Sequence, residues 1–483
     1  MEKLISKGFI KSSLIYTLAG TLPLASGFIL LPFYILHLST DLYGALSVYL
    51  VFSLLVQILV TFSFDTSVYI HFHELKGDPE KLSRFISSAF VFMLLAGLGV
   101  GLILTVSGDF VFRMVLSNKN VSFYPFGLVS VGAGIFQAIF KVHSSLLQSR
   151  EKPELFFWSN VFSFSLIASL TIVGLILYPG TLIGPVTGRF IASLIPGLWA
   201  LFRIFREFGF HYDFAWLRSS FSFNAYTFLY QLQQWVINQF DRILMLFFLL
   251  LGDVGVYDFA IKCLIPIELL MNSLHNSFYP KVVSTLIAQE EKGSVPEVNR
   301  YYHGLTAVVM LMVCGSILAL PWGIELFVRK PSYQQAIDYI PYLALIYLFR
   351  TMRLFFSVPY GILKYSKPLP VIYFIISSVK ILGMIVLIRY LQVYGVIVAS
   401  LLSVMVEVIL LRMNMKRFVF RFNFFKIVMA PLIMFVTIVL LEPTVAKFYP
   451  TGMHVLYVLS CGGLLWWAYR KELKLINPLQ AKR

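Results

Sequence analysis

The chain has 483 residues, of which 59% are hydrophobic and only 13% charged. An ordinary soluble protein carries about 25% charged residues, so this composition excludes a soluble domain as the main body of the protein. The formal net charge is nevertheless +16, and the position of that charge is informative. The three cysteines, Cys263, Cys314 and Cys461, lie far apart in apolar segments, which indicates neither a disulfide framework nor a metal site.

About fourteen hydrophobic stretches follow one another along the chain, each close to the roughly 20 apolar residues that a helix needs to cross a bilayer. We predict helices, because the backbone in lipid must satisfy its own hydrogen bonds and the stretches lack the alternation of a membrane barrel. The N-terminal residues MEKLISKGFIK lead into the first stretch without a small-residue cleavage site, so we expect a retained first helix. The predicted spans are 12–36, 42–70, 85–107, 124–147, 155–178, 182–203, 222–249, 254–280, 304–327, 339–363, 369–390, 393–413, 422–442 and 452–470.

The distribution of Lys and Arg predicts the orientation of these spans. Alternate loops, counted from the N-terminal side, hold about 26 basic residues, whereas the opposite loops hold about 6. This asymmetry places both termini in the cytoplasm and makes the number of spans even. Most of the positive charge is therefore a topology signal that also attracts anionic lipid head groups, and it is not a nucleic-acid footprint. The basic loops include Lys76, Lys81, Arg84, Arg150, Lys152, Arg203, Arg206, Arg218, Arg412, Lys416, Arg417 and Arg421.

Short motifs recur at an offset of about 211–216 residues, a self-similarity that transporters show. The pairs are Asp41-Leu-Tyr-Gly44 with Asp253-Val-Gly255-Val-Tyr257, Tyr124-Pro125 with Tyr339-Ile-Pro341, Lys152-Pro153 with Lys367-Pro368, and Gly184 with Gly395. We therefore predict an all-α polytopic membrane protein with two pseudo-symmetric six-helix lobes, two C-terminal helices and a cavity between the lobes. The predicted domains are an N-terminal lobe at 1–203, a cytoplasmic amphipathic linker at 204–221, a C-terminal lobe at 222–416, and two extra spans with a basic cytoplasmic tail at 417–483.

Four short motifs carry a family resemblance: Asp41-Leu-Tyr-Gly44, Asp241-Arg242, Gly255-Val-Tyr257 and Tyr333-Gln-Gln-Ala336. The chain resembles, over essentially its whole length, the polysaccharide-export, O-antigen flippase (Wzx-type) branch of the multidrug/oligosaccharidyl-lipid/polysaccharide (MOP) flippase superfamily. The resemblance implies a multi-pass protein of the bacterial inner membrane. Its cargo would be a polyprenyl-pyrophosphate-linked oligosaccharide, a repeat unit of O-antigen, capsule or exopolysaccharide, carried from the cytoplasmic to the periplasmic leaflet by alternating access. Membrane lipids are implied partners, and a polysaccharide polymerase and chain-length machinery are candidate ones; no nucleic acid, cofactor or metal is expected.

Basic residues predominate among the ionisable residues deep in the spans. Such a residue costs at least about 2.5–3.5 kcal/mol in the bilayer centre, so it should face a cavity or a partner. The candidates for binding a pyrophosphate are Arg350, Arg353, Lys141, Arg189, Lys262 and Lys380. Arg350 and Arg353 are three positions apart and so share one helix face. The alternative is that these two side chains form salt bridges between helices, for example with Asp241 or Glu407.

The seventh predicted span presents amides and aromatic rings on one face. The candidates for contacting sugar hydroxyls are Asn224, Gln231, Gln234, Trp235 and Asn238. The alternative is that the amides join helices through interhelical hydrogen bonds. Asp241 and Arg242, in the same span, are predicted to form a structural lock or gate, and Asp65 is a candidate gate, proton site or pairing residue.

Three other functions compete with this interpretation. A drug or cation antiporter of the same superfamily should carry acids deep in spans one, seven and ten, but span one has none and span ten has two arginines. A lipid II flippase differs only in its cargo. A membrane polysaccharide polymerase or glycosyltransferase would need a large outer loop or an acidic cluster, and the sequence has neither, so we do not expect an enzyme.

Overall fold

The computed structural model describes Gly20, Leu22 and residues 25–115, 121–288, 296–362, 368–414, 422–445 and 452–476. Throughout this described part the regular structure is helical, which confirms the predicted all-α class. Helices occupy the fourteen predicted spans, of which the first, 12–36, is described only in part. Nine helical segments among the described residues are individually long and apolar enough to cross a membrane. The chain is therefore a multi-pass membrane protein.

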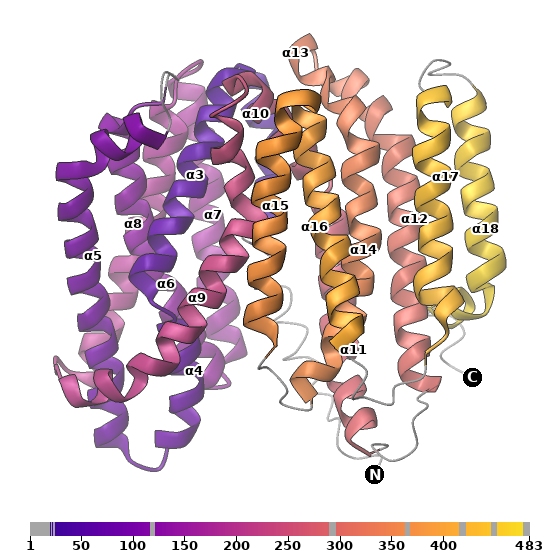
Figure 1. Cartoon of the computed structure of the whole chain (residues 1–483). Coiled ribbons are helices and arrows are strands. Elements are labelled where there is room, and N and C mark those ends of the chain that lie inside the picture. The colour runs from indigo at the N-terminus through magenta and orange to yellow at the C-terminus, as the bar shows by residue number, and fades with distance from the viewer. Residues whose placement is uncertain are drawn as a thin grey trace. The chain divides into compact units, whose positions relative to one another are not determined.

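The chain divides into two compact units, Met1–Asp258 and Phe259–Arg483. The helices of the first unit run roughly along one direction (Figure 1). They are α2 Leu31–His37, α3 Thr40–Thr61, α4 Phe64–Leu75, α5 Pro79–Val115, η1 Phe123–Gly127, α6 Leu128–Ser149, α7 Pro153–Leu177, α8 Ile183–Phe208, α9 Phe214–Met245 and the first part of α10, Leu251–Cys263. The domain boundaries placed at residues 203 and 222 stay a prediction. The predicted linker at 204–221 is mostly helical, because α8 continues to Phe208 and α9 begins at Phe214.

The second predicted span, 42–70, consists of two helices separated by a break. Ser39 caps α3, since its hydroxyl accepts a hydrogen bond from the backbone N–H of Leu42 at 3.3 Å. The helix ends where Phe62 and Ser63 adopt left-handed conformations, with φ of 41° and 59°. Non-glycine residues seldom adopt positive φ, so the surrounding structure must hold these two in place. The break puts α4 on its own axis beneath α3 (Figure 1).

The connections that the sequence predicts to be cytoplasmic meet at one end of the first unit. Ser83, near the start of α5, donates a hydrogen bond to the carbonyl of Phe208 at the end of α8 at 2.6 Å. Arg150, after α6, forms a salt bridge of 2.9 Å with Glu207 and lies over the ring of Phe208 at 4.9 Å. The basic connections after α4, α6 and α8 are therefore neighbours in space, as the alternation of the spans requires.

The repeated glycine motif is a reciprocal helix contact within the first unit. Gly44 is the fifth residue of α3, and Gly255 is the fifth residue of α10. A Cβ at Gly44 would lie 2.1 Å from the carbonyl oxygen of Leu251, and a Cβ at Gly255 would lie 2.1 Å from that of Thr40. Each glycine thus admits the first residue of the other helix, which explains why both copies of the motif need glycine at this position.

The second unit contains the rest of α10 and the C-terminal helices. These are α11 Ile265–Ala288, α12 Pro296–Phe327, α13 Pro331–Gln334, α14 Ala336–Ile362, α15 Leu369–Leu391, α16 Val393–Asn414, η3 Phe425–Met429, α17 Ala430–Val445 and α18 Gly452–Ile476. α15 and α16 pack closely as an antiparallel pair, with Gly395 against Leu387 and Gly383 against Ala399. α14 packs on α12 and α16, and its two arginines, Arg350 and Arg353, are partly buried.

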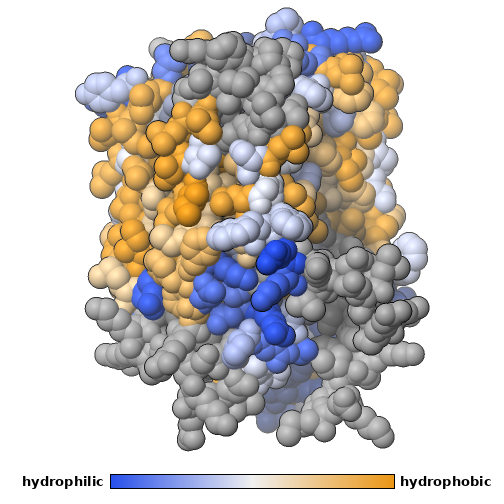
Figure 2. Space-filling view, turned by 90° about the vertical axis from the view of Figure 1, so that its right-hand side faces the viewer, coloured by the Kyte–Doolittle hydropathy of each residue, from blue (hydrophilic) through white to orange (hydrophobic). Residues whose placement is uncertain are grey.

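The outer surface has the character expected of a lipid-facing protein. On the face shown in Figure 2, hydrophobic residues cover much of the surface, and hydrophilic residues gather mainly in its lower half. Large apolar side chains of the C-terminal helices are exposed, including Leu440 of α17 and Trp466 of α18. The three cysteines are buried and form no disulfide among the described residues. Apolar residues thus face outward as well as inward, as they do when the surrounding solvent is lipid.

Candidate functional site

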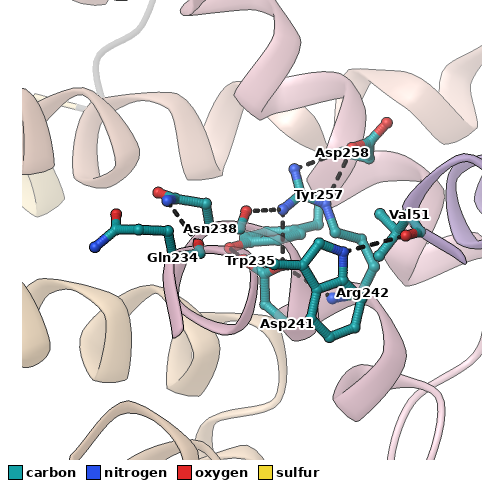
Figure 3. A network of polar contacts seen from close by, with 8 residues as sticks. All are labelled: Val51, Gln234, Trp235, Asn238, Asp241, Arg242, Tyr257 and Asp258. Atoms are coloured by element: carbon teal, nitrogen blue, oxygen red, sulfur yellow. Dashed lines mark hydrogen bonds and ion pairs between the residues drawn. The ribbon is translucent and has the colours of Figure 1, made fainter. Parts of the chain in front are cut away.

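A buried network of charges joins α9 to α10 in the first unit (Figure 3). Arg242 donates a hydrogen bond from Nη1 to Asp241 at 2.7 Å, and bonds of 3.2 Å from Nε and Nη2 to Asp258. Nη1 also donates to the carbonyl of Asn238 at 2.8 Å, and the Tyr257 hydroxyl donates to Asp241 at 2.8 Å. The side chains of Arg242, Asp241 and Asp258 are between 3% and 6% exposed. Each charge in the network thus faces an opposite charge, and its role as a structural lock or gate stays a prediction.

Asp258 is the residue of this network that the sequence interpretation missed. It lies within the predicted span 254–280, so an inventory of every acid inside the spans would have found it. Its pairing with Arg242, 16 positions away, depends on the packing of α10 against α9 and is not visible in the local pattern.

Three of the candidate sugar-contacting residues lie beside this network. Trp235 is buried, and its indole N–H donates to the carbonyl of Val51 at 3.2 Å (Figure 3). Asn238 is exposed and donates to the carbonyl of Gln234 one turn earlier at 2.8 Å. The Nε2 atom of Gln234 is buried and makes no hydrogen bond within the described residues. Trp235 therefore joins α9 to α3, whereas Gln234 and Asn238 keep donor capacity.

A second polar cluster lies where α4 begins. Lys141 of α6 forms a salt bridge of 2.9 Å with Asp65, and Gln231 of α9 donates to both oxygens of the same carboxylate at 3.1 and 3.3 Å. The hydroxyl of Ser145 donates to the backbone carbonyl of Asp65 at 2.5 Å. Asp65 is 15% exposed and Lys141 is 39% exposed. Asp65 is thus a pairing residue that ties three helices together, and Lys141 remains the more accessible partner.

Asn224 is completely buried next to the break between α3 and α4. The ring of Phe62 lies 5.3 Å from that of Phe221 and 5.2 Å from that of Phe228. These two residues are three and four positions from Asn224, so Asn224 shares the face of α9 that meets the break. Neither amide atom of Asn224 has a hydrogen-bond partner among the described residues. The same holds for the buried hydroxyls of Thr61, Ser63 and Ser220.

Arg350 of α14 pairs with a carboxylate of α11 in the second unit. Its Nη1 lies 3.3 Å from Oε2 of Glu268, and the Tyr347 hydroxyl donates to the same oxygen at 3.4 Å. The guanidinium lies over the ring of Tyr347, 5.2 Å from its centroid. Arg350 and Glu268 are 24% and 29% exposed, so this pair is accessible on one side.

Arg353 pairs with Glu407, the partner that the sequence alternative named, but the pair is loose. Its Nη1 lies 3.8 Å from Oε1 of Glu407, which is too far for a hydrogen bond. Arg353 Nε and Glu407 Oε1 are both buried and lack a hydrogen-bond partner in the described part of the chain. Arg353 is 28% exposed, whereas Glu407 is 2% exposed. The two arginines lie on one face of α14, as predicted, and each has an acidic partner.

The remaining candidate cations lie in separate places. Arg189 of α8 is partly buried, and its charge acts on the buried Tyr34 of α2. Lys262 of α10 is partly buried, and Lys380 of α15 is 4% exposed. Within each unit the structure gathers Lys141, Arg350 and Arg353 into pairs with carboxylates. A phosphate-binding role for any of them stays a prediction.

Comparisons with known proteins agree on the family and the fold. The model of a family described as polysaccharide biosynthesis protein matches residues 9–286. A comparison with curated proteins finds no match. Among solved structures, the chain is similar to the lipid II flippase MurJ in an inward closed conformation, with 16% identity, a TM-score of 0.72, and coverage of 96% of this chain and 100% of that one.

Transporters of the MATE family, from the MOP superfamily, are also similar. An inward-facing multidrug resistance transporter has 13% identity and a TM-score of 0.66, covering 85% of this chain and 99% of that one. An outward-facing one has 12% identity and a TM-score of 0.56, covering 85% and 98%. At these identities the likeness shows the fold, and the family model supplies the affiliation. The chain belongs to the polysaccharide biosynthesis protein family and has the helical fold of the MOP superfamily.

Proposed function

We propose that this protein is a flippase that moves a polyprenyl-pyrophosphate-linked oligosaccharide across the bacterial inner membrane, from the cytoplasmic to the periplasmic leaflet. The family match carries this proposal, since it associates the chain with polysaccharide biosynthesis and the chain is a multi-pass membrane protein. The N- and C-termini would lie in the cytoplasm, on the side of the basic loops. Translocation would proceed by alternating access, with no covalent step and no cofactor.

Arg350 and Arg353 are the proposed ligands of the pyrophosphate. Both guanidinium groups are partly exposed on one face of α14. A guanidinium has five N–H donors, and Nη1 of Arg353 lies 3.8 Å from Glu407, beyond hydrogen-bond distance, so Arg353 keeps donors for phosphate oxygens. Arg353 in particular has a buried Nε–H that no described residue uses. Two neighbouring guanidinium groups also match the two phosphates of a pyrophosphate.

A drug or cation antiporter fits the charges less well. Such a protein needs carboxylates that are available to a cation, but each deep carboxylate described above already faces a Lys or Arg. Asp65 faces Lys141, and Glu268 and Glu407 face the two arginines. The lipid II flippase is a similar structure, and lipid II is named as the cargo of that protein. The sugar specificity of this chain would come from Gln231, Gln234 and Asn238, whose amides suit sugar hydroxyls.

Charge-balanced variants test the proposal without leaving a buried charge unpaired. The first is Arg350→Gln with Glu268→Gln, the second is Arg353→Gln with Glu407→Gln, and the third combines all four changes. Purified protein would be reconstituted into vesicles with a fluorescent polyprenyl-pyrophosphate oligosaccharide. A glycosidase that cannot cross the membrane would then report the fraction of oligosaccharide on the outer face.

We expect the quadruple variant to lose flipping, because both proposed phosphate ligands are removed. Each double variant should flip the lipid more slowly than the wild type. Arg113→Ala is the control, since Arg113 is 81% exposed and pairs only locally with Asp109. Flipping at the wild-type rate by the quadruple variant would refute the assignment of the two arginines as phosphate ligands. Failure of the wild-type protein to flip any such lipid would refute the proposed function itself.

A further inference from the structure

The two arginine–carboxylate pairs of the second unit differ in how well they are bonded. Oε2 of Glu268 lies 3.3 Å from Arg350 and accepts a hydrogen bond from Tyr347, and the carboxylate is 29% exposed. Glu407 is 2% exposed, and its Oε1 has no hydrogen bond and lies 3.8 Å from Arg353. An ionised carboxylate in a buried site costs free energy unless hydrogen bonds or an opposite charge compensate it. At Oε1 of Glu407, the compensation that the described residues provide is the charge of Arg353 at 3.8 Å.

Among the described residues, α14 and α15 are the helices that pack most extensively on α16, which carries Glu407. α14 contributes Arg353 and, farther away, Arg350, both of which act on the carboxylate electrostatically. α14 also contributes Tyr360, whose hydroxyl donates to the carbonyl of Leu411 at 2.8 Å. α15 contributes Lys380, which is buried and has contacts of its own. Arg353 also acts electrostatically on His275 of α11, so His275 is a second group near this guanidinium that can titrate.

We propose that Glu407 is a proton-binding switch that controls whether Arg353 can bind the anionic cargo. When Glu407 is ionised, it holds the guanidinium by charge. A proton taken from water and added to a carboxylate oxygen of Glu407 removes that attraction, and the guanidinium becomes available to a phosphate. The proposal deepens the proposed function, because it assigns the regulation of the same phosphate site.

The sign of the coupling follows from linkage. If protonation of Glu407 strengthens the binding of the anion, then binding of the anion must equally strengthen the binding of the proton. Each cargo molecule bound at a pH where Glu407 is ionised takes up as much as one proton. The affinity then rises by as much as about tenfold for each unit by which the pH falls. An antiporter would show the opposite sign, because its proton and cargo exclude each other.

The test measures the binding of a farnesyl glucosyl pyrophosphate diester to the purified full chain in detergent, from about pH 5 to about pH 8. This probe lacks the second ionisation near pH 6 that a phosphate monoester has, so its own charge stays constant. Calorimetry in two buffers of different ionisation enthalpy gives the number of protons taken up. We expect the wild-type protein to bind more tightly as the pH falls and to take up as much as one proton.

Glu407→Gln keeps the shape of the side chain and removes its charge. This variant should bind the probe with an affinity that does not depend on pH and that matches the tightest wild-type value. Glu268→Gln and His275→Asn are the matched controls, and both should keep the wild-type slope. Equal slopes for Glu407→Gln and the wild type would overturn the proposal, as would wild-type binding without proton uptake. Wild-type binding without proton uptake overturns the proposal even if no variant folds. Absence of any binding would refute the proposed function together with the switch.

Discussion

Replacement of Gly44 or Gly255 by alanine should destabilise the first unit, although alanine is the better helix former. In an open helix position, glycine to alanine gains as much as about 1 kcal/mol. At Gly44 the new Cβ would lie 2.1 Å from the carbonyl oxygen of Leu251 and 3.0 Å from the backbone nitrogen of Gly255. A carbon atom normally stays about 3.3 Å or more from a carbonyl oxygen, so α3 and α10 would have to separate by about 1 Å.

Overpacking of this kind typically costs about 1–3 kcal/mol, and backbone atoms cannot rotate away as a side chain can. We therefore expect each single variant to lose about 1–3 kcal/mol of unfolding free energy. The same separation of the helices relieves both clashes. The double variant should therefore cost clearly less than the two single losses added together.

The assay is the unfolding of purified protein in detergent, by heat or by denaturant. Gly99→Ala in α5 and Gly315→Ala in α12 are the controls, because a Cβ at either position meets nothing within 4 Å. Both controls should be as stable as the wild type or slightly more stable. The reasoning would be refuted if Gly44→Ala were as stable as Gly99→Ala, or if the two single effects added fully.

Two further variants test the buried polar groups of the first unit. Arg242→Ala leaves Asp241 and Asp258 buried at 3% exposure without their cation, so we expect a loss of about 3–5 kcal/mol in unfolding free energy, measured by thermal unfolding and by yield after membrane insertion. Arg113→Ala on the surface is the control and should change stability little. A loss no greater than that of Arg113→Ala would contradict the stabilising role of the network. Asn224→Leu should stabilise the protein by about 1–3 kcal/mol, because both buried amide atoms lack partners among the described residues and leucine has a similar volume. Gln231→Leu is the contrasting control and should destabilise the protein, because it removes the two hydrogen bonds to Asp65. A destabilised Asn224→Leu variant would show that the Asn224 amide has hydrogen-bond partners in the membrane.

The sequence was sufficient to predict the helices, because they depend on local patterns, and the two related halves stay a prediction. Hydrophobic length predicts the spans, and the spacing of the glycine motifs predicts two related halves. It did not reveal that Gly44 and Gly255 contact each other, since the partner of a glycine is set by the packing of distant helices. The sequence predicts one helix over 42–70, because neither Phe62 nor Ser63 is a residue type that usually ends a helix.

For the candidate site, too, the sequence predicts which residues share a helix face but not which residues they contact. The spacing of Arg350 and Arg353 places them on one face, but the choice of their counter-charges depends on which helices flank α14. The sequence analysis names Glu407 as a candidate partner, and the structure adds Glu268 as the partner of Arg350. Asn224 belongs to the polar face of α9 by its spacing, yet its complete burial follows from the break in the neighbouring span.

The length of α5 has a consequence for how the first unit meets the bilayer. Charges mark the two ends of this 37-residue helix, with Arg84 paired to Glu80 near its start and Arg113 paired to Asp109 near its end. The uncharged stretch from residue 85 to residue 108 is about 36 Å long. A hydrocarbon core of about 30 Å accommodates it at an inclination of roughly 30°, within the range that spanning helices adopt. In a thinner membrane α5 would tilt further. Because Ser83 and Ser87, near the start of α5, donate hydrogen bonds to the carbonyls of Phe208 and Gly209, the end of α8 would move with it.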